Sequence, residues 1–422
     1  MKTFPGGLHL KEEKLTAQSP IRTAKPTKKV SILLSQHTGA ICEPLIKIGD
    51  QVKVGQKIGD SSALISAPVH SPVSGKVLTI DLQLHPDGRM IKGIVIENDY
   101  QETIHESVKS YPDLNQLSPD EIKKAVREAG IVGLGGAAFP THVKLSQVEI
   151  VILNGSECEP YLTVDHRLML EEGEGITYGL KAILKATGAT KGLVGIEDNK
   201  PDAVKAMEKT GLEVVPLKVK YPEGSEKQLI KSITGREVPP GGLPMDVGVV
   251  VSNVGTAAQI ARTLKTGMPL IERVVTVTGR AIKTPANLKV KLGTSFADLI
   301  EECGLIAEVG KVIMGGPMMG LAQFSLEVPV IKATTGIVVY PGEEVEIVKP
   351  TPCIKCGKCV EVCPVYLLPN ILEDAAENQR YDLCQEYHIL DCMECGLCSY
   401  VCPAKRELIH WIKIAKAEVS RI

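Results

Sequence analysis

The sequence of 422 residues has no run of about 18 consecutive apolar residues, which a membrane-spanning helix requires, and no apolar secretory-signal stretch near its start. Its formal net charge of −2 gives no reason to expect a strongly basic face of the kind that binds nucleic acid. No Ser/His/Asp or Cys/His arrangement typical of a nucleophilic enzyme is recognisable. We therefore expect a soluble or peripheral protein of about two to four domains that does not bind nucleic acid.

Cysteine, by contrast, is abundant: twelve are present, and eight of them form two repeats of the spacing C-x2-C-x2-C-x3-C followed by proline. The first repeat consists of Cys353, Cys356, Cys359 and Cys363, and the second consists of Cys392, Cys395, Cys398 and Cys402. This spacing is typical of paired [4Fe–4S] clusters, because three thiolates of one loop bind one cluster and the fourth reaches the other. The predicted ligand sets are Cys353, Cys356 and Cys359 with Cys402, and Cys392, Cys395 and Cys398 with Cys363.

Two structural zinc sites are the alternative to two clusters. Zinc takes four ligands, usually as two separated pairs, which leaves the proline after the fourth cysteine of both repeats unexplained. Between the repeats, residues 367–387 have a helical composition without a strand pattern. We therefore predict a helical 2[4Fe–4S] ferredoxin-like domain over residues 345–422. Because two adjacent clusters transfer single electrons, another cofactor is needed to supply them.

A glycine-rich loop follows a predicted helix in the middle of the chain. Residues 118–121, Ser-Pro-Asp-Glu, form a capping-box sequence that predicts a helix from there to about Ala129. The loop that follows contains Gly133, Gly135 and Gly136, and its small residues would let backbone amides approach a phosphate or a ring. Glycine clusters are more often simple turns, so this pattern alone does not establish a binding site.

A strand-like apolar run over residues 149–153 precedes the polar segment Asn-Gly-Ser-Glu-Cys-Glu-Pro at residues 154–160. Ligands of α/β proteins bind at the carboxyl ends of such strands. The side chains of Asn154, Glu157 and Glu159 could therefore bond the hydroxyl or amide groups of a cofactor, although a polar turn is the simpler interpretation.

Four blocks of sequence together resemble the FMN- and NADH-binding subunit of respiratory complex I. They are Gly-x-Gly-Gly-Ala-x-Phe-Pro-Thr from residue 133, Asn-x-x-Glu-x-Glu-Pro from 154 with Asp-x-Arg from 165, Tyr-Pro-Glu-Gly-Ser-Glu from 221, and Val-Ser-Asn-Val-Gly-Thr from 251. The chain is still more similar to the C-subunit family of the Rnf complex, a membrane-bound ferredoxin:NAD oxidoreductase. That similarity runs from Phe-Pro-Gly-Gly-Leu-His at residues 4–9 to the second cysteine repeat.

The resemblance implies particular cofactor contacts. Residues implied to contact FMN are Gly133, Gly135, Gly136, Lys144, Asn154, Glu157, Ser252 and Asn253. NADH would stack on the flavin near Phe139, Glu159 and Glu226. Two positions depart from the complex I pattern: Leu134 stands in place of an arginine, and Ser225 in place of the first glutamate of a Gly-Glu-Glu sequence. The implied NADH site is therefore less complete than the implied FMN site.

The resemblance and the local patterns together predict a multidomain α/β architecture. The expected parts are an N-terminal arm (1–27), a biotinyl/lipoyl-like barrel-sandwich domain (28–98), a Rossmann-like FMN/NADH-binding domain of the complex I type (112–265), a small ubiquitin-like SLBB domain (270–322) and the cluster domain (345–422). No lysine occupies the barrel hairpin at residues 61–63, so a covalent swinging arm is not expected. The barrel is expected to have a structural or interaction role.

The expected function is electron transfer between NAD(H) and the clusters through FMN, because a flavin converts two-electron hydride chemistry into single-electron steps. The resemblance implies peripheral attachment to the cytoplasmic face of the inner membrane through other Rnf subunits, which would also carry ion transport and the contact with ferredoxin. Two alternatives are a cobalamin reductase of propanediol metabolism, in which the barrel follows the clusters, and a non-catalytic electron carrier that has lost NADH binding.

Overall fold

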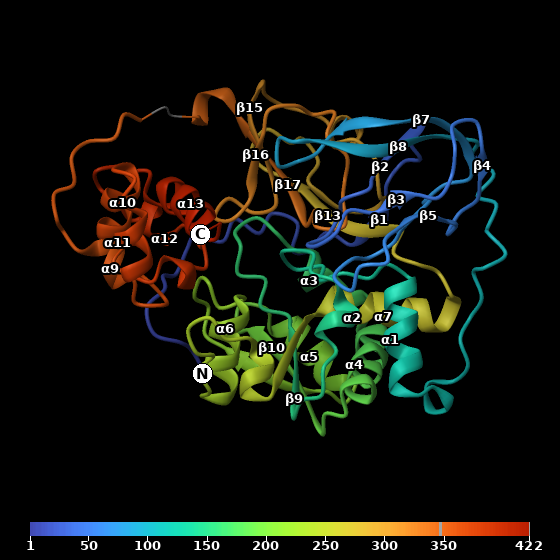
Figure 1. The fold of residues 1–422 in the computed structure, drawn as a ribbon, viewed down its shortest axis with the longest axis horizontal. Coiled ribbons are helices and arrows are strands. Elements are labelled where there is room, and N and C mark those ends of the chain that lie inside the picture. Colours follow the sequence, from blue (N-terminus) through green and yellow to red (C-terminus); the bar gives the residue numbers. More distant parts are fainter. Residues whose placement is uncertain (346–347, 422) are drawn as a thin grey trace.

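The computed structural model describes residues 1–345 and 348–421. An α/β layer lies below two β-rich parts, and the C-terminal helices form a lobe beside both (Figure 1). The predicted cluster domain includes residues 346, 347 and 422, which lie outside the described residues. No helix among the described residues is long and apolar enough to cross a membrane.

A parallel four-stranded sheet forms the centre of the α/β layer, in the order β11-β10-β9-β12. Its strands are β9 (Ile150–Asn154), β10 (Lys191–Glu197), β11 (Glu213–Leu217) and β12 (Val249–Asn253). The helices of this layer are α1 (Pro119–Glu128), α2 (Thr141–Lys144), α3 (Val164–Glu171), α4 (Gly173–Thr187), α5 (Pro201–Lys209), α6 (Glu226–Thr234) and α7 (Val254–Thr266), with the 3-10 turns η1 (Leu114–Gln116) and η2 (Pro244–Val247). This layer is called the flavin fold below.

Strand β9 shows how the sequence forms this sheet. Its apolar residues are buried on both faces, as parallel strands covered by helices require. Ile150 and Ile152 pack in a core shared with α6, whereas Val151 and Leu153 join the main core with α4 and α7. Packing on both faces therefore fixes the position of Asn154 at the carboxyl end of the strand.

The helix predicted from residue 118 is confirmed as α1, and its capping box is present. Ser118 Oγ accepts a hydrogen bond from the backbone N of Glu121 at 3.3 Å, and the Glu121 carboxylate accepts one from the backbone N of Ser118 at 2.7 Å. The helix is followed by Gly130, whose φ is +65°, and a Cβ atom there would lie 2.2 Å from the carbonyl oxygen of Pro68. Only glycine therefore allows the barrel domain to approach the glycine-rich loop this closely.

The barrel-sandwich domain consists of two small antiparallel sheets, in the orders β2-β8-β7-β4 and β3-β5-β6. Their strands are β2 (Lys29–Leu33), β3 (Glu43–Pro44), β4 (Gln51–Val52), β5 (Lys57–Asp60), β6 (Val69–His70), β7 (Gly75–Leu84) and β8 (Met90–Asn98). The hairpin that begins at Ser61 packs on the flavin fold, because Arg127 Nη2 of α1 donates to the Ser61 carbonyl at 2.7 Å. This hairpin therefore serves as a contact between domains.

A six-stranded sheet in the order β1-β14-β13-β17-β15-β16 forms the second β-rich part. Its elements are β1 (Ile21–Thr23), β13 (Glu272–Thr278), β14 (Ala286–Lys291), α8 (Phe296–Cys303), β15 (Val309–Met314), β16 (Leu321–Gln323), β17 (Gly336–Pro341) and the 3-10 turn η3 (Gly342–Glu344). The sheet continues past residue 322, because β17 pairs with both β13 and β15. It also includes β1 of the N-terminal arm, which pairs with β14.

The C-terminal lobe is helical, as predicted. Its elements are α9 (Lys358–Glu361), α10 (Pro369–Glu377), α11 (Tyr381–Glu386), the 3-10 turn η4 (Ile389–Asp391), α12 (Leu397–Tyr400) and α13 (Leu408–Val419). Helices α10, α11 and α13 pack on one another around a core that contains Leu372 and Ile412. The predicted mixed α/β architecture with a helical C-terminal domain is therefore confirmed.

Candidate functional site

Asn154 and Asn253 lie side by side at the carboxyl edge of the parallel sheet. The strand order reverses between β9 and β12, and the register pairs Asn154 with Asn253. In open α/β sheets such a point of reversal leaves a crevice in which ligands bind. Ser252, another predicted FMN contact, is buried immediately before Asn253. The fold thus brings together predicted FMN contacts that are about a hundred positions apart in the sequence.

Two hydrogen bonds hold the side chain of Asn253 at the start of α7. Its Oδ1 accepts from the backbone N of Gly255 at 2.8 Å, and its Nδ2 donates to Asp165 Oδ2 at 2.7 Å. Burial raises the pKa of Asp165 to about 7, and the neighbouring carboxylate of Glu157 acts in the same direction. Asp165 therefore holds its proton more tightly in the folded protein than an exposed aspartate does.

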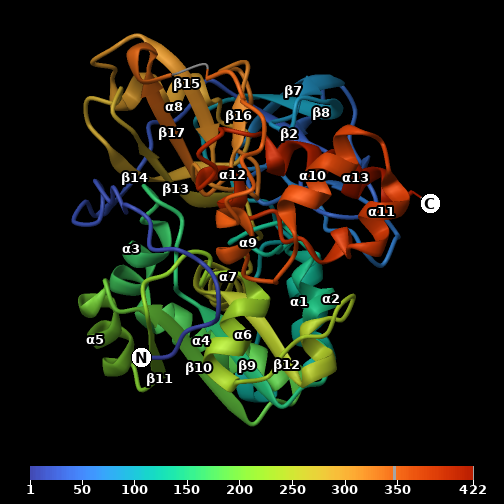
Figure 2. The same cartoon turned by 90° about the vertical axis from the view of Figure 1, so that its left-hand side faces the viewer.

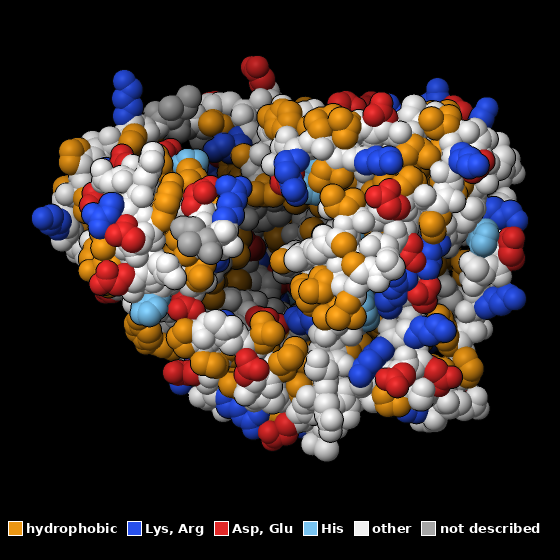
Figure 3. Space-filling view, in the orientation of Figure 1, with side chains coloured by type: hydrophobic (Ala, Val, Ile, Leu, Met, Phe, Trp, Pro, Cys, Tyr) orange, Lys and Arg blue, Asp and Glu red, His pale blue; other side chains and the backbone are white. Residues whose placement is uncertain are grey.

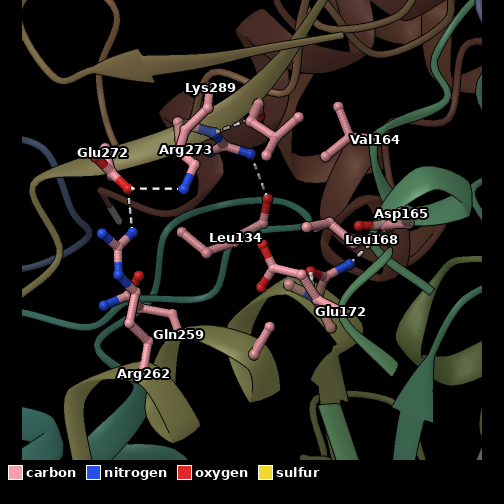
Figure 4. A pocket seen from close by; sticks show the side chains of 14 residues that line it. Leu134, Val164, Asp165, Leu168, Glu172, Gln259, Arg262, Glu272, Arg273 and Lys289 are labelled. Atoms are coloured by element: carbon pink, nitrogen blue, oxygen red, sulfur yellow. Dashed lines mark hydrogen bonds and ion pairs between the residues drawn. The ribbon is translucent and has the colours of Figure 1, made fainter. Parts of the chain in front are cut away.

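Leu134 is anchored by its backbone between the flavin fold and the six-stranded sheet. Its N–H donates to Thr256 Oγ1 at 2.9 Å, and its carbonyl accepts from Arg273 Nη2 at 3.1 Å. Leu134, Arg273 and Asp165 line a small cavity of about 50 Å³, and Figure 4 shows the contact between Leu134 and Arg273. Burial lowers the pKa of Arg273 to about 10, and Asp165 opposes this shift. A guanidinium is therefore present beside position 134, but it comes from β13.

The three glycines of the loop have different surroundings. The backbone N of Gly133 donates to the Phe139 carbonyl at 2.9 Å, which closes the loop on itself. A Cβ atom at Gly135 would lie 2.8 Å from Nδ2 of Asn253, whereas one at Gly136 would meet no atom within 4 Å. Gly135 therefore packs against the site, and Gly136 faces open space that a cofactor could occupy.

Polar side chains hold the segment that follows β9. Asn154 Nδ2 donates to the Gly224 carbonyl at 2.7 Å. The carboxylate oxygens of Glu157 accept the backbone N–H groups of Asp165 and His166, at 2.8 and 3.1 Å. Glu157 thus caps the amino end of α3, where the partial positive charge of the helix favours a carboxylate. An FMN contact from Glu157 would share these oxygens with α3.

Lys144 and Glu226 form an ion pair, with 2.6 Å between Nζ and Oε1. Lys144 ends α2, which follows the glycine-rich loop, and Glu226 begins α6. Their side chains are 31% and 36% exposed, so a ligand can reach both. Figure 3 shows a hollow between the C-terminal lobe and the β-rich parts, and comparison with Figure 1 places α6 at its lower edge. The pair joins a residue implied for FMN to one implied for NADH.

Glu159 is engaged with the loop after β15. Its carboxylate accepts the backbone N–H groups of Met318 and Met319, at 3.1 and 2.8 Å. Burial raises the pKa of Glu159 to about 7. Phe139 is half-buried at the end of the glycine-rich loop. Of the residues implied for NADH, Glu159 therefore binds the backbone of the loop after β15, whereas Glu226 forms an ion pair with Lys144.

Four cysteines from both repeats surround one cavity in the C-terminal lobe. Cys353, Cys356, Cys359 and Cys402 line a cavity of about 200 Å³, and they are called the outer set below. Thiols around such a volume fit a cubane, whereas zinc bound at about 2.3 Å from each sulfur would leave no such space. Within the described residues, no three His, Cys, Asp or Glu side chains are close enough to hold a single metal ion.

The remaining four cysteines of the repeats also lie together and are called the inner set: Cys392, Cys395, Cys398 and Cys363. Burial raises the pKa of the first three cysteines of the second repeat, Cys392, Cys395 and Cys398, that of Cys395 to about 12, and the neighbouring thiol of Cys363 acts in the same direction. Cys363 of the first repeat therefore lies beside the second repeat. The structure thus brings the four cysteines of each predicted ligand set near one another.

The two cysteine loops have the same local geometry. The backbone N of Lys355 donates to Cys353 Sγ at 3.4 Å, and the backbone N of Glu394 donates to Cys392 Sγ at 3.4 Å. Lys355 and Glu394 have φ values of 55° and 59°, so each is in the left-handed region. Such N–H donors to cluster thiolates are expected to tune a bound cluster.

The inner set lies against the flavin fold, and the outer set faces solvent. The hydroxyl of Tyr221 donates to the Cys395 carbonyl at 2.8 Å. Tyr221 and Cys395 also share a small buried core, against which Cys158 packs. In contrast, Cys353 and Cys356 are exposed. The fold therefore distinguishes two cysteine sets that look equivalent in the sequence.

Sequence patterns do not single out three residues that the structure places at the site: Tyr221, Arg273 and Lys14. Tyr221 lies in one of the blocks that carry the family resemblance, so that block was the signal that could have identified it. Arg273 and Lys14 stand in ordinary strand and loop contexts without any motif. Their roles follow only from the residues that they meet in space.

Four family models match the chain in the order of its parts. They are the RnfC barrel sandwich hybrid domain (residues 2–101), the Nuo51 FMN-binding domain (126–262), the SLBB domain (274–322) and the 4Fe-4S dicluster domain (352–405). These matches confirm the predicted identity and order of the folded parts.

Curated relatives match over nearly the whole chain. The C-subunit of the Na(+)-translocating ferredoxin:NAD(+) oxidoreductase complex of Acetobacterium woodii is 49% identical over 99% of this chain and 97% of its own length. The C-subunit of the proton-translocating ferredoxin:NAD(+) oxidoreductase complex of Clostridium ljungdahlii is 46% identical, over 99% and 94%. The C-subunit of the ion-translocating oxidoreductase complex of Vibrio cholerae is 40% identical over 92% of this chain, which spans 52% of that longer protein.

Among solved structures, the NAD+-reducing [NiFe]-hydrogenase in the air-oxidized state contains a chain that superposes with a TM-score of 0.54. The match is 19% identical in sequence and covers 74% of this chain and 67% of the hydrogenase chain. At this identity the likeness shows a shared fold.

Proposed function

Because this chain belongs to the C-subunit family of ion-translocating ferredoxin:NAD oxidoreductase complexes, we propose that it exchanges electrons between NAD(H) and a protein partner inside such a complex. FMN and two [4Fe–4S] clusters are its cofactors. Bound FMN supplies the exchange between two-electron hydride chemistry and single-electron transfer. The residues of this chain bind these groups, set their spacing and limit access of solvent to them.

The residues around the reversal point fit FMN. Asn154 and Asn253 present amide groups at neighbouring strand ends, and Gly136 leaves open space beside them. The start of α7, a helix of thirteen residues, adds backbone N–H groups that favour an anion such as a phosphate. We therefore assign FMN to this edge of the sheet, with Lys144 as a cation at its open side.

The observation that carries the proposal is the contact between Tyr221 and Cys395. This hydrogen bond supports a position of the inner set next to the flavin fold, whereas Cys353 and Cys356 of the outer set are exposed. Electron transfer becomes slow over long distances, so the inner set is the cluster site that serves the flavin. The outer set is then the site that an external redox partner can approach.

We assign the NADH-facing side of the site to Glu226 and Phe139. The Glu226 carboxylate is accessible and can accept hydrogen bonds from an amide or a ribose hydroxyl. Glu159 contributes indirectly in this arrangement, because its carboxylate holds the backbone of Met318 and Met319.

The relatives are subunits of complexes with several subunits. We propose that this chain is likewise held at the cytoplasmic face of the inner membrane by partner subunits, one of which transfers electrons from ferredoxin. Ion transport would then reside in those partners.

Anaerobic titration of the isolated protein with NADH tests the proposal. Loss of the flavin absorbance at substoichiometric NADH, followed by a paramagnetic signal from reduced clusters, is the expected result. A flavin that NADH does not bleach, in protein with its full iron content, would instead support the electron carrier without NADH binding.

A further inference from the structure

The loop between β9 and α3 has a backbone shape that needs external support. Glu157 and Tyr161 have φ values of 50° and 69°, although neither is glycine. Left-handed backbone costs free energy for such residues and persists only where the surroundings hold it. The same loop carries Glu157 and Glu159, which the site uses, so its conformation matters for cofactor binding.

The N-terminal arm supplies that support through Lys14. The Nζ atom of Lys14 donates to three carbonyl oxygens of this loop, those of Glu157 at 2.8 Å, Glu159 at 2.8 Å and Leu162 at 2.7 Å. An ammonium group has three N–H donors, and each is used here. Removal of the ammonium group would leave three carbonyls of one loop without this donor.

Further contacts keep the arm alongside the loop. The backbone N of Tyr161 donates to the Glu12 carbonyl at 2.8 Å, and the hydroxyls of Thr16 and Thr163 are 2.6 Å apart. Figure 2 shows the N-terminal segment crossing the flavin fold toward β14, where β1 joins the sheet. The arm therefore reaches the loop as part of a fixed structure.

The same arm also contacts the inner cysteine set. The backbone N of Gly7 donates to the Val362 carbonyl at 2.9 Å, one residue before Cys363. Gly6 has a φ of +70°, and a Cβ atom there would lie 2.7 Å from the Cys363 carbonyl oxygen. One short segment thus passes from the inner cysteines to the flavin loop.

We infer that Lys14 is a positioning residue for FMN, because its three hydrogen bonds hold the loop of residues 157–162 in the conformation that the flavin site requires. The inference rests on the proposed FMN site. Without the ammonium group, the loop would be ordered only when FMN binds, and the cost of ordering would weaken binding.

The test compares Lys14→Ala with Lys11→Ala in the full chain. Lys11 is a matched control from the same arm, because its side chain is 78% exposed and pairs with Glu13. In flavin-free protein, hydrogen exchange should increase in residues 155–166 of Lys14→Ala and remain unchanged in β10. FMN affinity should fall at least tenfold in Lys14→Ala at unchanged iron content, and stay at the parent value in Lys11→Ala.

Chemical rescue separates positioning from a general loss of stability. The Lys14 side chain lines a small pocket together with Glu12, Cys158 and Glu197, and propylammonium has the carbon and nitrogen atoms that Lys14→Ala removes. Propylammonium should restore FMN affinity to Lys14→Ala, and tetramethylammonium, which has no N–H donor, should not. If Lys14→Ala fails to retain iron, Lys14→Met keeps the packing without a donor and provides the same comparison.

Two outcomes are distinguishable. If the parent protein binds no FMN, the proposed function is wrong. If the parent binds FMN and the Lys14 variants bind it equally well with unchanged exchange in residues 155–166, the inference about Lys14 alone is overturned.

Discussion

Lys144 and Glu226, which are 82 positions apart in the sequence, form an ion pair with 2.6 Å between Nζ and Oε1. One ends the short helix after the glycine-rich loop, and the other begins α6. The ion pair is partly exposed, so it contributes little to stability, about 0.2–1 kcal/mol. Because both side chains are partly exposed, a ligand can reach them.

Glu226→Ala should weaken NADH binding about tenfold or more, because loss of a hydrogen bond to a charged group costs about 1.5–3 kcal/mol and each 1.4 kcal/mol is a factor of ten. FMN and iron contents should stay at parent values. NADH titration of the anaerobic protein, followed by flavin absorbance, measures this affinity. Glu237→Ala is the control, since that side chain is 73% exposed. Equal bleaching of Glu226→Ala and the parent at low NADH would contradict the assignment.

Gly136→Val should abolish FMN binding without changing the flavin-free fold. A Cβ atom at this position meets no protein atom within 4 Å, so the added side chain would occupy only the space assigned to the cofactor. Flavin content after reconstitution and the thermal midpoint of the flavin-free protein measure the two effects. Gly175 also has nothing within 4 Å, and Gly175→Val provides the control. Full flavin content in Gly136→Val would move the site elsewhere.

Gly135→Val should act differently from Gly136→Val. Its side chain would displace Asn253, which is 2.8 Å from the Cβ position, and so disturb the bond from Asn253 to Asp165. We expect both lower FMN content and a lower thermal midpoint of the flavin-free protein. An unchanged midpoint would mean that Asn253 can move aside without lowering the stability of the flavin-free protein.

Cys363→Ser should damage the inner cluster, although Cys363 belongs to the first repeat. The parent should contain about eight iron atoms per chain after anaerobic reconstitution, and the variant about four. Iron analysis and the paramagnetic signals of the reduced protein test this. Cys384→Ser is the control, because Cys384 is buried in the same lobe and belongs to neither set. Selective loss of the outer cluster in Cys363→Ser would show that Cys363 binds the cluster of its own repeat, and the predicted ligand sets would then be wrong.

Glu159→Gln should raise the thermal midpoint relative to the parent at alkaline pH but not at acidic pH. Burial raises the pKa of Glu159 from 4.5 to about 7, so the folded protein binds this proton more tightly than the unfolded chain does. The free energy of unfolding therefore falls as pH rises from the unfolded pKa through the folded one, and glutamine avoids this loss. Midpoints measured from about pH 4 to about pH 8, which spans both pKa values, give the difference. Glu213→Gln, at a side chain that is 60% exposed, should track the parent throughout.

The sequence by itself determined the features that depend on a few neighbouring residues. The spacing of the cysteine repeats predicts two clusters, because the reach of three thiolates in one loop is set by local chain geometry. The capping box at Ser118 predicts the start of α1, because its two hydrogen bonds join residues only three positions apart. The apolar run before Asn154 predicts the buried strand β9. The four sequence blocks then identified the flavin fold, and the family resemblance together with local patterns predicted the SLBB part and the barrel.

Only the tertiary structure decided which of these local features meet. It placed the inner cysteines beside Tyr221, joined Lys144 to Glu226, turned the Glu159 carboxylate to the loop at Met318, and brought Lys14 to carbonyls more than 140 positions away. Such contacts depend on how several domains pack, and the residues that make them carry no local signal of their partners. The roles of Lys14 and Glu159 therefore follow from the fold, whereas the cluster cysteines are readable from the sequence.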